Sequence, residues 1–164
     1  MITPDIIDKN IFNSILFHLE SAEERDNDEM RYMNEIHNKV VDTKNCIIYI
    51  QDNKSTHYSN KNTVLYNQLQ ELFGNSDLVL DCFYKFRYNG GDYAKTHKDS
   101  YSNQTSLLLL SDNFTGGDFI LDHKRVNFNK QGMFINFDST KRHSVSEIIT
   151  GHRDVLVMLF QNKK

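Results

Sequence analysis

Cysteine is scarce in this sequence, which excludes several classes of protein. The 164 residues include two cysteines, Cys46 and Cys82, which lie far apart and each within an apolar run. They lack the close spacing of a zinc knuckle or of a thiol redox motif. The sequence therefore predicts buried free thiols in an intracellular protein, with a disulfide between the two cysteines as the alternative.

Long apolar runs and an excess of positive charge are also missing. No stretch of about 18 apolar residues occurs, and the first residues show no basic region followed by an apolar segment. We therefore expect no membrane span and no secretion signal, and a cytoplasmic or otherwise intracellular location. The formal net charge of -3 offers no basic surface to a phosphate backbone, so a nucleic-acid partner is not expected.

The composition is that of an ordinary globular protein with one core. Hydrophobic residues make up 38% of the 164 residues and aromatic residues 12%, which is enough for one sizeable core and too little for two. We expect residues 1–164 to form a single domain. Its pattern divides into a helical support over about residues 1–75 and a β-rich core over about residues 78–160.

Two helices are expected in the first half of the chain. Residues 3–5 supply a cap and a first-turn proline for a helix whose apolar stripe runs from Ile7 to Leu19. A second helix is predicted from about Asn62 to Phe73, with Gly74 as its stop. The residues expected on its buried face are Leu65, Leu69 and Leu72.

From residue 78 onward, apolar residues recur with period two between turns, as in a β-sandwich or barrel. The glycine-rich turns 89–92 and 115–117 and the turn 122–123 separate the strands. An earlier strand at 46–50 brings the total to about eight, enough for an α+β, mainly β fold of the jelly-roll type with helices on one outer face. The strands are expected at 78–88, 105–110, 118–121, 124–128, 133–137, 143–149 and 153–160.

His97 and Asp99 form a His-x-Asp pair that can bind one metal ion. In an extended segment their side chains project to the same side, so an imidazole nitrogen and a carboxylate oxygen can reach the same ion. The pair alone is weak evidence, since such pairs arise by chance. His143, at the start of a later strand, can complete the 2-His-1-carboxylate arrangement that leaves three adjacent positions free on Fe(II).

Arg153 lies on an apolar strand face, ten residues after His143. Strand alternation places it on the same face as Val155, Val157 and Leu159, and places Asp154 opposite. An arginine on an apolar face needs a partner, and a carboxylate bound by two parallel hydrogen bonds matches its geometry best. A bound anion would provide that carboxylate. The alternative is a structural ion pair, for example with Asp81 or Glu147.

Taken together, the segment from Tyr84 to Phe160 resembles the catalytic core of prolyl-hydroxylase-like Fe(II)- and 2-oxoglutarate-dependent oxygenases. The family pattern places an aromatic and glycine segment before His-x-Asp, followed by a Gly-Gly turn and a glycine before an apolar strand. A distal histidine and a basic residue nine or ten positions later complete it. The corresponding parts here, about half of the chain, are Arg87–Asp99, Thr115–Phe119, Gln131–Phe137, His143 and Arg153.

The resemblance implies a site and a reaction. His97, Asp99 and His143 would hold Fe(II), and Arg153 would bind the 5-carboxylate of 2-oxoglutarate, whose oxidative decarboxylation by O2 would drive hydroxylation of a substrate. Ascorbate is expected to support activity. In this family a tyrosine usually binds the same carboxylate. Tyr88 fits that place best, while Tyr93 is the alternative or could line the substrate entrance.

The substrate is less well defined than the reaction. The resemblance favours peptidyl proline, and hence a protein or peptide partner, with residues 51–61 and 100–104 as candidate covering segments. A free amino acid or another small molecule is the alternative, and a non-enzymatic metal-binding jelly roll is a different class. Two departures from the family pattern bear on this choice. Arg153 replaces the lysine of collagen-type enzymes, which favours a resemblance to the oxygen-sensor-like or the bacterial and viral branches. Asp118 is followed directly by Phe119, which leaves substrate choice open. Nothing in the sequence indicates an oligomeric state.

Overall fold

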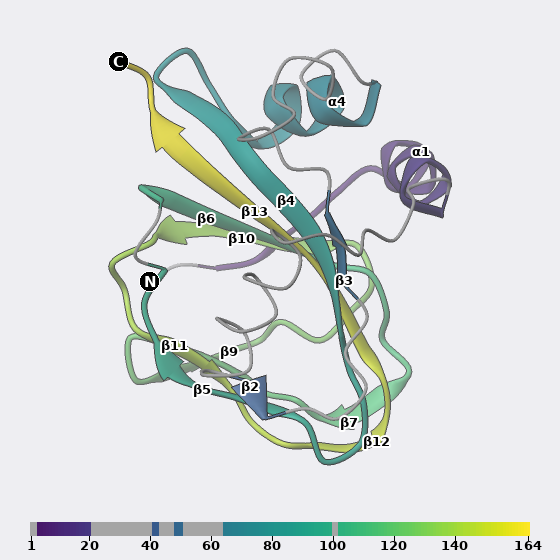
Figure 1. The fold of residues 1–164 in the computed structure, drawn as a ribbon. Helices are drawn as coiled ribbons and strands as arrows, with labels where there is room; N and C mark the ends of the chain where they lie inside the picture. The colour runs from purple at the N-terminus through teal and green to yellow at the C-terminus, as the bar shows by residue number, and fades with distance from the viewer. Residues whose placement is uncertain (1–2, 21–40, 43–47, 51–63, 100–101) are drawn as a thin grey trace.

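The computed structural model describes residues 3–20, 41–42, 48–50, 64–99 and 102–164 (Figure 1). In this part of the chain most elements are strands, and the helices are α1 (Lys9–Glu20) and α4 (Val64–Phe73), which confirms the mainly β class. Three predicted features lie wholly or partly outside the described residues. They are the covering segment expected at 51–61, residues 100–101 of the covering segment expected at 100–104, and Cys46. None of the described helices is long and apolar enough to cross a bilayer.

Two antiparallel sheets face each other (Figure 1). The large sheet has the order β1 (Asp5–Ile6), β10 (Met133–Asp138), β6 (Gln104–Leu109), β13 (Arg153–Asn162), β4 (Leu78–Tyr88) and β3 (Ile48–Ile50). The small sheet has the order β2 (Val41–Asp42), β5 (Tyr93–His97), β11 (His143–Val145), β8 (Phe119–Leu121) and β9 (Lys124–Val126). A separate ribbon pairs β7 (Phe114–Gly116) with β12 (Ile148–Gly151).

The chain passes repeatedly from one sheet to the other. It runs through β4 in the large sheet, β5 in the small, β6 in the large, β8 and β9 in the small, β10 in the large, β11 in the small and β13 in the large. This alternation is the jelly-roll arrangement expected from the sequence. Because of it, residues far apart in sequence meet between the sheets.

Apolar side chains fill the space on both faces of the large sheet, because its strands alternate between them. The layer between the sheets, called here the intersheet core, includes Phe86, Leu109, Ile135 and Val155 from the large sheet and Phe119, Leu121 and Val145 from the small one. The second layer joins the large sheet to α1 and α4, which lie on its outer face in Figure 1. Along β13, Val155 and Leu159 face inward while Leu156 and Met158 face the helices.

Both helices differ in detail from their predictions. The first begins at Lys9, because the Asp8 carboxylate accepts hydrogen bonds from the backbone N–H groups of Asn10 (3.0 Å) and Ile11 (3.2 Å). Residues 3–5 therefore do not form the cap, and β1 pairs instead with β10. In α4, Leu65 and Leu69 are buried as predicted, but Phe73 takes the place expected for Leu72, which is 36% exposed.

The long apolar strands were predicted well and the short polar ones were not. The segment expected as one strand at 143–149 is broken into β11 and β12, which join different sheets. The polar strand β5 and the short β1, β2 and β7 carry too weak an alternation to predict. The turn at Asp122 and His123 is confirmed, since both residues have positive φ (53° and 65°) between the paired strands β8 and β9.

Candidate metal centre

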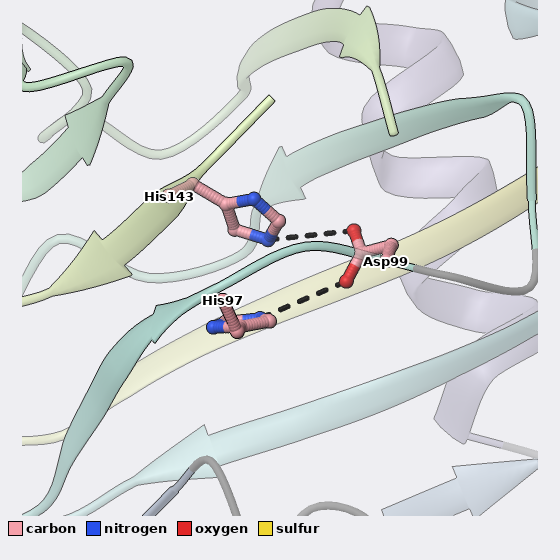
Figure 2. Close-up of side chains that lie close together, drawn as sticks. All are labelled: His97, Asp99 and His143. Atoms are coloured by element: carbon pink, nitrogen blue, oxygen red, sulfur yellow. Dashed lines mark ion pairs between the residues drawn. The ribbon is translucent and has the colours of Figure 1, made fainter. Parts of the chain in front are cut away.

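His97, Asp99 and His143 converge at one end of the space between the sheets (Figure 2). His97 ends β5 and lies directly opposite His143, which begins β11. The Asp99 Oδ1 atom is 3.6 Å from His97 Nε2, and Oδ2 is 3.4 Å from His143 Nε2. One ligand atom from each residue falls within 4.8 Å of the others, a spacing that can accommodate one metal ion.

A bulge in β5 gives His97 its inward orientation. Ala94 pairs with Val145, and His97 pairs with His143, so three steps along β5 correspond to two along β11. The extra residue lets Ala94, which is buried in the intersheet core, and His97 face the same side despite their odd separation. Asp99, the third candidate ligand, lies outside β5, at the start of the loop that follows this strand.

Hydrogen bonds fix the orientation of both imidazole rings. His97 Nδ1 lies 2.6 Å from the backbone oxygen of Lys95, and His143 Nδ1 lies 3.0 Å from that of Lys141. A carbonyl oxygen can only accept, so each Nδ1 carries the proton and each Nε2 presents a lone pair to the centre. Burial lowers the pKa of His97, and the neighbouring His143 lowers it further. Both conditions favour the neutral form that binds metals.

Asp99 is held in its ionised form by the groups around it. Burial acts to raise the pKa of its carboxyl, but the neighbouring His143 side chain and the hydrogen bond donated by Thr105 outweigh that effect, and the pKa lies below its usual value. Thr105 Oγ1 donates to Asp99 Oδ2 at 2.6 Å. The Asp99 backbone N–H also donates to the Ser139 carbonyl (3.0 Å). An anionic oxygen ligand therefore faces two imidazole nitrogens, a donor set suited to a divalent transition metal.

Arg153 is buried between the sheets, and no described residue forms an ion pair with it. The side chain is 1% exposed, and neither Nε nor Nη2 has a hydrogen-bond partner among the described residues. Burial lowers the pKa of the guanidinium, and Tyr88 opposes that shift. Arginine stays protonated in proteins, so this position places a positive charge with unused donors inside the protein.

A row of aromatic rings connects Arg153 to the histidine end of the site. The guanidinium carbon is 5.9 Å from the Phe128 ring centroid, and Phe128 lies 5.7 Å from Phe119. The Phe119 ring is in turn 6.1 Å from that of His143. Gly117 packs closely against this region, because a Cβ there would lie 2.5 Å from Ile148 Cδ1 and 3.3 Å from Arg153 Cδ. A continuous row of aromatic contacts thus runs from Arg153 to His143.

The two candidate tyrosines occupy different faces. Tyr88 is the cross-strand partner of Arg153 and lies under its guanidinium, 5.4 Å from ring centroid to Cζ. Tyr93 neighbours the inward-facing Ala94 on β5, so alternation directs it away from the intersheet core. The alternative ion pairs of Arg153 with Asp81 or Glu147 do not form among the described residues. These contacts favour Tyr88.

Sequence reasoning missed three hydroxyl residues behind the aspartate: Ser102, Thr105 and Ser139. Thr105 is 2.9 Å from Ser139, which is 2.7 Å from Ser102, measured between side-chain oxygens. Serine and threonine are common in strands and turns, so nothing in the pattern distinguished these from others. Phe128, beside Arg153, was assigned only to a strand.

Comparison with solved structures finds the same fold in enzymes of one kind. A prolyl 4-hydroxylase from Pseudomonas putida aligns over 99% of this chain and 93% of its own, with 12% identity and a TM-score of 0.57. The viral collagen prolyl hydroxylase of Paramecium bursaria Chlorella virus-1, in complex with 2-oxoglutarate, aligns over 98% and 96%, with 14% identity and a TM-score of 0.57. A Trichoplax adhaerens prolyl hydroxylase aligns over 99% and 83%, with 13% identity and a TM-score of 0.57.

These similarities establish that the chain has the jelly-roll fold of prolyl hydroxylases and other Fe(II)/2-oxoglutarate oxygenases. They confirm the fold expected from the sequence. No protein-family model and no curated protein matches the sequence.

Proposed function

We propose that this protein is an Fe(II)- and 2-oxoglutarate-dependent oxygenase that hydroxylates a substrate side chain. The observation that carries the proposal is a 2-His-1-carboxylate cluster connected by a row of aromatic rings to a buried arginine whose Nε and Nη2 have no hydrogen-bond partner among the described residues. A structural metal would need no such cation, whereas a dicarboxylate that binds the metal at one end needs a positive partner at the other.

In this proposal each residue has one task. His97, Asp99 and His143 would hold Fe(II) as a 2-His-1-carboxylate set. Arg153 binds the 5-carboxylate of 2-oxoglutarate with help from Tyr88, and the surrounding phenylalanines exclude water. The bound iron would supply O2 activation coupled to conversion of 2-oxoglutarate to succinate and CO2. Ascorbate is expected to keep the iron reduced.

The proposed substrate is a proline within a peptide or protein loop. Support comes from the fold shared with prolyl hydroxylases, one of which is in complex with a peptide fragment of the hypoxia inducible factor oxygen degradation domain. Identities of 12–14% with these enzymes leave a free amino acid or other small molecule as the alternative substrate class. Mass spectrometry of a proline-containing peptide panel would show one added oxygen on proline if the first class is correct.

The test of the oxygenase itself is conversion of 2-oxoglutarate to succinate, with and without added iron. We expect iron-dependent succinate formation by the wild type and its loss in His143→Ala and in Asp99→Ala, because each removes a ligand from an open catalytic site. His18→Ala, which changes a histidine on α1, serves as the matched control and should remain active. Turnover in Asp99→Ala at the wild-type rate would refute the assignment.

A further inference from the structure

A chain of three hydroxyl groups ends on the Asp99 carboxylate. Thr105 Oγ1 donates to Asp99 Oδ2 at 2.6 Å, Ser139 Oγ lies 2.9 Å from Thr105 Oγ1, and Ser102 Oγ lies 2.7 Å from Ser139 Oγ. Thr105 and Ser139 are both 0% exposed. Burying a hydroxyl group costs free energy unless the group forms hydrogen bonds, so the partners of these hydroxyls indicate their role.

The hydrogen bonds in this chain can run in one direction only. Each hydroxyl has a single hydrogen, and a carboxylate can only accept. Since Thr105 gives its hydrogen to Asp99, Ser139 must donate to Thr105, and Ser102 must donate to Ser139. Every donor points toward the carboxylate, and each bond polarises the next.

The fold directs these hydroxyls at Asp99 from the large sheet. Thr105 alternates with Leu107 and Leu109 of the intersheet core, and its cross-strand partner is Phe137, two residues before Ser139. Ser139 also accepts a hydrogen bond from the Asp99 backbone through its carbonyl oxygen. The small sheet thus supplies the two histidines, while the large sheet holds the carboxylate.

We propose that Thr105 is a positioning residue that restricts Asp99 to coordination of the metal through one oxygen. The inference rests on the proposed function, since it takes His97, Asp99 and His143 as ligands. Both oxygens lie near a histidine, Oδ1 3.6 Å from His97 Nε2 and Oδ2 3.4 Å from His143 Nε2, but only Oδ2 accepts the hydrogen bond from Thr105, which leaves Oδ1 as the oxygen with its lone pairs unused among the described residues. A carboxylate bound through both oxygens would fill one of the three positions that the oxygenase chemistry needs.

The test is a titration of the full chain with Co(II), followed by visible absorption, which reports both affinity and coordination. Thr105→Val keeps the shape of the side chain and removes the hydroxyl, so we expect affinity to fall about 10- to 100-fold and the Co(II) spectrum to change. Thr105→Ser keeps a hydroxyl donor and should therefore keep the wild-type Co(II) affinity and spectrum. Ser106→Ala is the matched control, because it removes a fully buried hydroxyl from the other face of β6.

Ser139→Ala provides a second, milder variant in case Thr105→Val does not fold. It leaves Thr105 in place and removes only the donor behind it, so we expect a loss of about two- to tenfold. The role of Thr105 would be overturned, with the proposed function left intact, if both Thr105→Val and Ser139→Ala kept the wild-type Co(II) affinity and spectrum. An effect of Ser106→Ala as large as that of Thr105→Val would overturn it in the same way. If the wild type itself failed to bind Co(II), the proposed function would be overturned instead.

Discussion

A guanidinium inside a protein is stable only when its donors find partners. Arg153 is 1% exposed, and in the part of the chain that the structure describes two of its nitrogens have no hydrogen-bond partner. Tyr88 lies under it, yet an aromatic face replaces neither a counter-charge nor a hydrogen-bond acceptor. At the scale of the residue, this unmet requirement is the most specific pointer to an anionic cosubstrate. It also predicts how the site responds when the charge or its geometry is changed.

Arg153→Ala should raise the KM for 2-oxoglutarate while iron affinity stays near that of the wild type. A charge-assisted pair in a mostly dry pocket is expected to contribute about 2 to 4 kcal/mol, or about thirty- to a thousandfold in binding. The KM of Arg153→Lys should fall between those of the wild type and Arg153→Ala, because lysine keeps the charge and loses the planar fork. Succinate formation at varied 2-oxoglutarate concentrations measures the effect, and an iron titration provides the control.

A 2-oxo acid without the distal carboxylate separates the carboxylate contact from a general effect on the fold. It should bind poorly to the wild type and lose little more in Arg153→Ala, since the contact is already absent. Equal losses for the two cosubstrates would mean that Arg153 acts through the fold and not through the carboxylate.

The residues of the metal centre could be predicted because chemistry restricts them to few types. Histidine and aspartate at a defined spacing, and an arginine on an apolar face, are unusual enough to stand out in one sequence. Thr105 and Ser139 could not be found in this way. Their role depends on which strands become neighbours, and that pairing between β6 and β10 is a property of the folded chain.

At the scale of the element, the pairing of β4 with β13 sets the position of the arginine. Arg153 lies opposite Tyr88, and the next pair along, on the outer face, is Asp154 opposite Arg87. Arg87 binds the Asp154 carboxylate with two parallel hydrogen bonds, Nε to Oδ1 at 2.8 Å and Nη2 to Oδ2 at 2.9 Å. This fork holds the two strands in register directly behind the proposed anion site.

Arg87→Ala should lower the free energy of unfolding by about 1 to 3 kcal/mol, because it leaves the mostly buried Asp154 carboxylate with weaker partners. Those partners are Lys85 at 4.0 Å and His152 at 3.8 Å. Arg125→Ala is the control, since its 2.8 Å pair with Asp118 is exposed (75% and 38%) and should contribute less than about 1 kcal/mol. Urea unfolding measures both. Similar losses in the two variants would contradict the structural importance of the Arg87 fork.

The elements of this fold were predictable where burial produces alternation. The strands β4, β6, β10 and β13 place alternate residues in two apolar layers, and each was expected close to its observed bounds. The strand β5 was not recognised as such, because its sequence is polar and its bulge disrupts the period of two. The break between β11 and β12 could not be predicted from the sequence either. Both strands contain apolar residues, and they differ only in the sheet that each one joins.

At the scale of the whole molecule, the candidate metal centre draws its residues from both sheets. His97 and His143 belong to the small sheet, whereas Asp99 is held by Thr105 of the large sheet and by Ser139, just beyond its strand β10. An ion bound by all three residues would tie the two layers of the jelly roll together at this end. Metal binding should therefore be coupled to unfolding of the domain and not only to local order around the site.

We expect Ni(II) or Co(II), which bind such ligands more tightly than Fe(II), to raise the thermal stability of the protein. At one hundred times its dissociation constant, the ion should stabilise the folded state by up to about 2.7 kcal/mol, which for a chain of this length corresponds to about 5 to 10 °C in Tm. A chelator should reverse the shift. Under the same conditions His143→Ala should show little of it, because two ligands hold the ion weakly. An equal rise in Tm for His143→Ala would place the bound ion elsewhere on the protein.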